Sequence, residues 1–79
     1  MRLTYIQEEI IGILQRVQAT YAYPVSSEEI SKELNVTSSY IREQTKILRL
    51  EGLVQVRRGP GGGYFLNKAR EGYNSEDFR

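Results

Sequence analysis

The sequence predicts a small domain that is mainly α-helical and carries a small β-hairpin, with three helices followed by two short strands. Three observations support this fold class. Apolar residues recur at helical spacing in three segments before Gly52, each bounded by residues that begin or end helices. After Gly52 the spacing changes to the alternation of a half-buried strand. Pro60 and the three glycines behind it then predict a turn that leads into a second strand.

The first helix is expected within residues 4–21, where the sequence reads TYIQEEIIGILQRVQATY. Thr4 can cap it, and Tyr23 ends the segment because the residue before a proline avoids helical geometry. Ile11 lies off the main apolar stripe, so we expect a face with Ile11 and Leu14 to be available to a second subunit. The apolar stripe itself comprises Ile6, Ile10, Ile13, Leu14, Val17 and Tyr21.

The second helix is expected within residues 25–35, VSSEEISKELN. Ser26 and Glu29 match the capping box, in which each side chain accepts a hydrogen bond from the other residue's backbone amide. Asn35 can end the helix because asparagine tolerates the left-handed conformation.

The third helix is expected within residues 38–52, SSYIREQTKILRLEG, with Gly52 at its end. Thr37 or Ser38 can cap it, and Ser38 is favoured. Arg49 is interpreted as a plain surface charge. The side chains expected to face inward are Ile41, Thr45 and Leu48, and those expected to face outward are Arg42, Lys46 and Arg49.

The hairpin is expected to pair LVQV at residues 53–56 with YFL at residues 64–66. One domain is therefore expected over residues 1–66. Residues 67–79 show little apolar periodicity and predict a short C-terminal tail that is irregular or dependent on a partner. Tyr73 and Phe78 in this tail are further candidates for a dimer interface.

The order of these elements is that of a winged helix-turn-helix, in which the hairpin is the wing. Ser31 is small where the third helix is expected to cross the second, and Val36 and Ile41 can fix a steep angle between them. At that angle the third helix can enter the major groove of DNA. The alternative is a three-helix domain with a hairpin that binds no DNA.

The distribution of charge favours the DNA-binding interpretation. The net charge is only +1, but residues 38–70 carry seven basic and two acidic side chains, whereas residues 1–37 carry three and five. The positive charge thus falls on the third helix and the hairpin, the two elements expected to touch a polyanion.

Composition excludes several other classes of function. The chain has no cysteine and no histidine, so thiolate ligands and the commonest general base are missing, and we expect no enzyme, metal or cofactor. No small-molecule ligand is evident. No apolar run approaches the ~20 residues of a membrane span and no signal peptide is visible, so we expect a cytoplasmic protein without membrane contact.

The exposed start of the third helix supplies one set of candidate DNA-binding residues. Arg42 can bind a guanine edge through two hydrogen bonds, and Glu43 can accept one from cytosine. These polar side chains could instead only cap and solubilise the helix, and Tyr40 could belong to the core. The full set is Thr37, Ser38, Ser39, Tyr40, Arg42, Glu43 and Lys46.

The glycine-rich turn supplies the second set, Arg57, Arg58, Gly61, Gly62, Gly63 and Tyr64. Glycines there would let the backbone approach DNA closely, and Gly62→Val is expected to leave the fold nearly intact. An arginine at the base suits a narrow minor groove. Tyr64 could equally pack in the core. We do not expect a nucleotide-binding loop, because no Lys-Ser/Thr follows and the next element is predicted to be a strand.

Residues 24–66, PVSSEEISKELNVTSSYIREQTKILRLEGLVQVRRGPGGGYFL, resemble the DNA-binding half of the Rrf2 family of bacterial repressors and activators. The most specific part is EGLVQVRRGPGGGYFL, which is similar to the family's wing motif GxxGGY and its flanking strands. The resemblance implies a winged-helix homodimer bound to double-stranded DNA. It places the third helix in the major groove and the wing arginine and glycines in the minor groove.

Two family features have no counterpart in these 79 residues: the long dimerisation helix after the wing, and the cysteines that bind an iron–sulfur cluster in the sensing members. A dimer would therefore need a different interface. We expect a sequence-specific DNA-binding transcriptional regulator. The alternative from another class is a winged-helix protein-interaction module without direct DNA binding.

Overall fold

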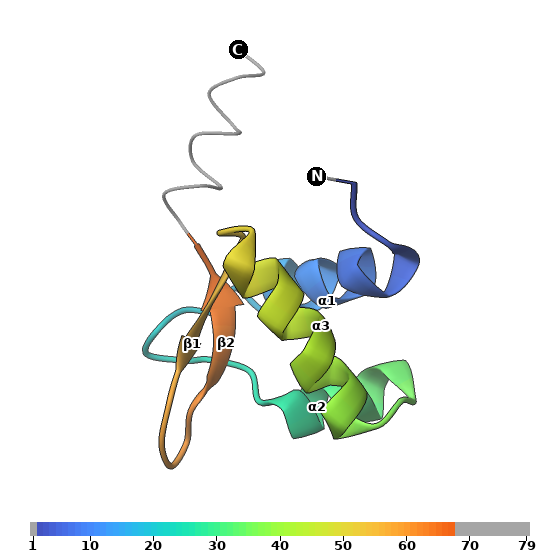
Figure 1. The fold of residues 1–79 in the computed structure, drawn as a ribbon. Coiled ribbons are helices and arrows are strands. Elements are labelled where there is room, and N and C mark those ends of the chain that lie inside the picture. The colour runs from blue at the N-terminus through green and yellow to red at the C-terminus, as the bar shows by residue number, and fades with distance from the viewer. Residues whose placement is uncertain (1, 68–79) are drawn as a thin grey trace.

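The computed structural model describes residues 2–67, and its elements confirm the predicted fold class. Figure 1 shows the hairpin standing beside α3, with its turn directed toward the same end of the molecule as α2 and the start of α3. Within residues 2–67, no helix combines the length and apolar character needed to cross a membrane. The elements are α1 (Tyr5–Arg16), α2 (Ser27–Leu34), α3 (Ser38–Leu50), β1 (Val54–Arg57) and β2 (Gly63–Leu66).

Helix α1 begins as predicted and ends earlier than predicted. Thr4 is its N-cap and forms a capping box with Gln7. The helix ends at Arg16, because Gln18 adopts a left-handed conformation (φ 55°) and its amide turns back to the carbonyl of Gln15 at 3.1 Å. Glutamine has no special preference for this geometry, so the residue type at position 18 does not indicate the boundary. Tyr23 therefore does not end the helix.

Two members of the predicted apolar stripe lie beyond this end and are exposed, Val17 at 50% and Tyr21 at 63%. The prediction that the apolar stripe of the first helix includes Val17 and Tyr21 is therefore wrong. Leu14 is fully buried, so the prediction that Leu14 is available to a second subunit is wrong. Ile11 is half-buried and packs against the edge of the core.

The turn between α2 and α3 follows the prediction closely. Ser26 and Glu29 form the capping box of α2, and Asn35 is left-handed (φ 60°). The cap of α3 is Thr37, whose hydroxyl accepts a hydrogen bond from the amide of Tyr40 at 3.2 Å. The preference for Ser38 as the cap is therefore wrong, and Ser38 is instead the first residue of the helix.

The core lies between the three helices and the hairpin. It confirms that Ile41, Thr45 and Leu48 face inward, and Thr45 satisfies its hydroxyl by donating to the carbonyl of Ile41 at 2.9 Å. Gln7 is also buried, and its amide nitrogen donates to Gln44 of α3 at 3.0 Å. The buried apolar residues are Ile10, Ile13, Leu14, Ala19, Ile30, Ile41, Leu48, Val54, Phe65 and Leu66.

Strands β1 and β2 are antiparallel, and the segment at Val25 pairs with β2 as well. Val54 pairs with Leu66 at one end of the ladder and Arg57 pairs with Gly63 at the other. On its far edge β2 forms an isolated bridge, in which the amide of Tyr64 donates to the carbonyl of Val25 at 2.7 Å. Sequence reasoning missed this bridge because one residue pair leaves no periodic pattern.

Candidate nucleic-acid interface

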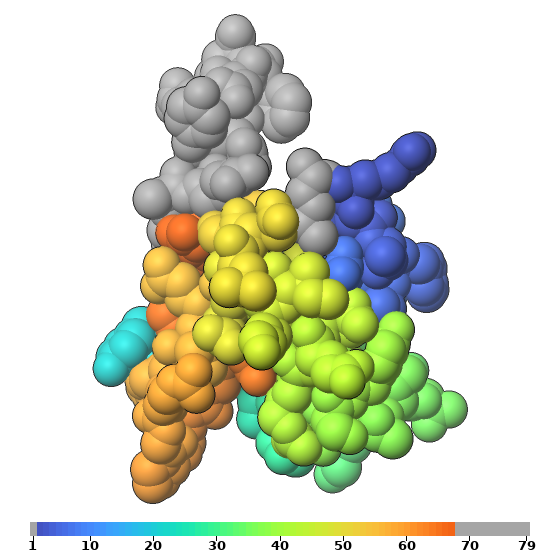
Figure 2. Space-filling view, in the orientation of Figure 1, coloured from blue at the N-terminus to red at the C-terminus, as the bar shows by residue number. Residues whose placement is uncertain are grey.

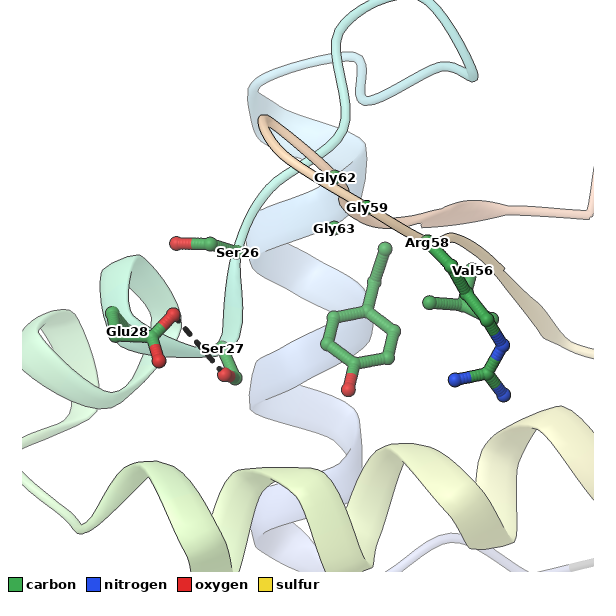
Figure 3. A pocket seen from close by; sticks show the side chains of 9 residues that line it. Ser26, Ser27, Glu28, Val56, Arg58, Gly59, Gly62 and Gly63 are labelled. Carbon is green, nitrogen blue, oxygen red and sulfur yellow. Dashed lines mark hydrogen bonds between the residues drawn. The ribbon is translucent and has the colours of Figure 1, made fainter.

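A shallow concavity of about 220 Å³ opens between the start of α2 and the wing. Figure 2 shows this hollow between the hairpin and the two helices, and Figure 3 shows Glu28 facing the same space as Arg58 from the opposite side. Of the predicted DNA-binding residues, four line it, all from the wing. The lining residues are Ser26, Ser27, Glu28, Val56, Arg58, Gly59, Gly62, Gly63 and Tyr64.

Arg42 reaches from α3 toward the start of α2. Its guanidinium donates to the hydroxyls of Ser27 at 3.4 Å and Ser38 at 3.5 Å, and it lies 3.7 Å from a carboxylate oxygen of Glu28. All three distances are long for such contacts, and both charged side chains remain more than half exposed. Arg42 is therefore held loosely, in a position from which it can turn to another acceptor.

The remaining DNA-binding candidates at α3 differ in how exposed their side chains are and in whether their polar atoms are already hydrogen-bonded. Ser39, Glu43 and Lys46 are exposed along the outer face of the helix. Thr37 uses its hydroxyl oxygen as the cap, and Tyr40 is 38% exposed. Tyr40 is therefore available for an outward contact and is not a member of the core cluster.

Arg49 departs from the interpretation as a plain surface charge. The residue is half-buried, and its Nε is buried without a hydrogen-bond partner among residues 2–67. Arg42 and Lys46 do face outward as predicted.

The tip of the wing is a β-turn of type II. The amide of Gly62 donates to the carbonyl of Gly59 at 2.9 Å, Pro60 occupies the second position, and Gly61 has the positive φ of 72° that the third position requires. Gly59 also has a positive φ, 100°, and sequence reasoning left it out of the site. The Pro-Gly pair inside the motif predicted a turn, and it is also the signal that could have identified Gly59 as the first residue of that turn.

Gly62 and Gly63 are required inside the fold. A Cβ on Gly62 would lie 2.1 Å from the carbonyl oxygen of Arg57, and one on Gly63 would lie 2.5 Å from the backbone of Val25. The expectation that Gly62→Val leaves the fold nearly intact is therefore wrong. Around Gly59 no atom of the described residues lies within 4 Å of an added Cβ, so bulk is tolerated there and only the φ is restrictive.

The two wing arginines point to opposite faces of the hairpin: Arg57 is the last residue of β1, and Arg58, directly after it, lines the concavity together with Val56. Arg58 is exposed, lines the concavity and makes no hydrogen bond or ion pair with another described residue. Arg57 faces away from the concavity, where it donates to the carbonyls of Tyr21 and Gly61. Of these two arginines, Arg58 is thus the one that is free to meet a ligand in the concavity.

Residues 9–76 match a family model described as "Rrf2: Iron-dependent Transcriptional regulator". The transcriptional regulator IscR of Erwinia tasmaniensis is 44% identical over 48 residues, a stretch covering 61% of this chain and 29% of that protein. IscR of Escherichia coli K12 is 45% identical over 47 residues, covering 60% and 29%. The matched stretch thus spans less than a third of the length of these relatives.

Two solved structures share the fold. CymR, described as the global cysteine regulator of B. subtilis, superposes with a TM-score of 0.62 at 24% identity, over 85% of this chain and 53% of that chain. IscR of T. potens superposes with a TM-score of 0.59 at 25% identity, over 85% and 50%.

Proposed function

The chain belongs to the Rrf2 family of transcriptional regulators, and on that premise we propose that it binds double-stranded DNA sequence-specifically and so regulates transcription. The observation that carries the proposal is the placement of the start of α3 and the turn of the wing at the same end of the molecule (Figure 1). A winged helix reads DNA with these two elements.

In this proposal α3 supplies the sequence specificity. Arg42 leaves its loose contacts on α2 to bind a base edge, and Glu43 and the hydroxyls of Ser38 and Ser39 can contact neighbouring bases or phosphates. Lys46, one turn further along, meets a phosphate.

The wing supplies a contact to the adjacent minor groove. Arg58 is the side chain proposed to enter it, because its guanidinium is exposed and unpaired among the described residues. Gly59 and Gly61 at the turn leave the backbone free of side chains where it would approach the sugar–phosphate backbone.

We propose that the chain acts as a homodimer, because a two-fold pair of small modules can bind two half-sites of a palindromic operator. Of the two residues predicted for such an interface on α1, the half-buried Ile11 is still available, whereas Leu14 is in the core. Tyr73 and Phe78, the other candidates, lie outside the described residues.

Iron has no place in this proposal, although the description of the family model names it. These 79 residues contain no cysteine and no histidine, and no group of three or more acidic side chains among residues 2–67 could hold a metal ion. The residues present therefore do not fit a thiolate-bound iron site. We also propose a cytoplasmic location and no enzymatic activity, which suit a regulator that acts on a bacterial chromosome.

Selection of bound duplexes from a random pool, followed by sequencing, tests the proposal. A palindromic consensus is the expected result and would also report the dimer. Recovery of no sequence preference, with binding that does not weaken as salt rises, would contradict it, because binding to phosphates is salt-dependent. Arg42→Ala, carried through the same selection, is the control for a consensus read by α3.

A further inference from the structure

Arg57 makes three contacts on the face of the hairpin that turns away from the concavity. Its Nη1 donates to the backbone carbonyl of Tyr21 at 2.8 Å, and its Nη2 donates to the carbonyl of Gly61 at 2.7 Å. The guanidinium also lies over the ring of Tyr21, 5.3 Å from the ring centre. One side chain thus joins the segment after α1 to the turn of the wing.

We propose that Arg57 is a positioning residue that fixes the wing turn on the segment of residues 17–24, and that it does not contact DNA. The effect on DNA binding rests on the proposed function. The effect on the free protein does not, because it concerns only the order of the wing.

The segment to which Arg57 is anchored is itself well held. The amides of Thr20 and Tyr23 each donate to the other's carbonyl, at 3.2 and 3.0 Å. The ring of Tyr21 packs edge-on against Phe65 of β2, with ring centres 5.8 Å apart. Val25, just beyond, forms the bridge to β2. These contacts attach the segment to β2, so the anchor of Arg57 is fixed relative to the sheet.

The wing turn needs such an anchor. A two-stranded hairpin alone is marginally stable, and glycines lose much backbone entropy when they are ordered. Gly59 and Gly61 bracket Pro60 with no side chains of their own to pack. A charge-assisted hydrogen bond to the carbonyl of Gly61 restricts the turn before any ligand arrives, which lowers the cost of ordering it on binding.

Two matched variants separate positioning from contact. Arg57→Met and Arg58→Met remove the same charge from adjacent residues and keep a long side chain. Two quantities are measured on each: hydrogen exchange of the Gly62 amide in the free protein, which reports the turn, and affinity for duplex DNA at several salt concentrations. Exchange of the Tyr64 amide, which bonds to Val25, serves as the internal reference.

For Arg57→Met we expect the Gly62 amide to exchange about 5- to 10-fold faster than in the wild type, on the order of the loss of one net hydrogen bond. Affinity falls several-fold, while the slope of log affinity against log salt stays the same because no phosphate contact is lost. For Arg58→Met we expect unchanged exchange and a slope smaller by about one unit. Arg57→Lys keeps the charge but not the two-pronged geometry, so its exchange should stay fast.

Unchanged exchange at Gly62 in both Arg57 variants would overturn the proposal. So would a salt slope that falls by about one unit in Arg57→Met, because Arg57 would then meet a phosphate itself. If the wild type binds no duplex DNA at any salt concentration, the proposed function fails, and the exchange data still decide whether Arg57 orders the wing.

Discussion

The guanidinium of Arg42 lies 3.7 Å from the carboxylate of Glu28, so the side chain proposed to read a base starts in an ion pair with the neighbouring helix. Both side chains are more than half exposed, and an exposed pair of this kind contributes roughly 0–1 kcal/mol. A base edge that offers two acceptors to the guanidinium can replace this weak contact, whereas the carboxylate of Glu28 repels a nearby phosphate. We therefore expect Glu28 to favour binding of a specific DNA sequence over binding of a random one.

Replacing this acid tests that role. Glu28→Gln is expected to raise affinity for random duplex DNA about 2- to 5-fold at low salt, and to lower the ratio of specific to random binding, because a negative charge beside the DNA surface is removed. Titrations on both duplexes measure it. Glu8→Gln, the same change on the first turn of α1, should alter neither affinity. An equal gain from Glu8→Gln would assign the effect to net charge alone.

Gly62 is expected to be far less tolerant of a side chain than its place in an exposed turn suggests. Gly62→Ala puts a Cβ 2.1 Å from the carbonyl of Arg57, and the shift needed should lower the free energy of unfolding by about 1–3 kcal/mol. Gly12→Ala meets nothing within 4 Å inside α1 and should raise it by about 0.5–1 kcal/mol. Urea denaturation measures both, and equal stability of Gly62→Ala and wild type would contradict the packing described here.

The end of α1 offers a stabilising substitution. Gln18 holds a left-handed conformation that glycine adopts without strain, so Gln18→Gly should raise the free energy of unfolding by about 0.5–1 kcal/mol. Gln15→Gly, inside the helix, should lower it by about 1 kcal/mol. A loss of stability in Gln18→Gly, measured by the same denaturation, would mean that α1 continues past Arg16.

The ends of the three helices show where the sequence was informative about the fold and where it was not. Asn35 and Gly52 indicate the ends of α2 and α3, because asparagine and glycine commonly adopt the left-handed conformation that they have here. Gln18 performs the same task and carries no such signal, so α1 was predicted too long. Helix starts that are capped by side chains were easier to predict than this helix end. The capping box of Ser26 and Glu29 is present as expected.

The candidate site was predictable in its elements and less so in its individual side chains. Arg57 ends β1 and Arg58 follows it, so side-chain alternation predicts opposite faces for the two, but which one faces the concavity depends on the packing of the hairpin. The partner of Arg57, the carbonyl of Tyr21, is a backbone group 36 residues away and leaves no pattern in the sequence. Likewise, Gly63 must be glycine because a side chain there would clash with the backbone of Val25. The bridge that brings Val25 close left no periodic pattern in the sequence.

The central claim is that α3 reads the sequence of duplex DNA, and one comparison tests it most directly. Affinities of wild type, Arg42→Ala and Lys46→Ala are measured on the selected site and on a random duplex across a range of salt. Arg42→Ala should cost about 1–3 kcal/mol on the selected site and much less on the random one. Lys46→Ala should weaken both alike and reduce the salt slope by about one unit. Identical behaviour of the two variants on both duplexes would contradict the claim, because neither side chain would then distinguish one sequence from another.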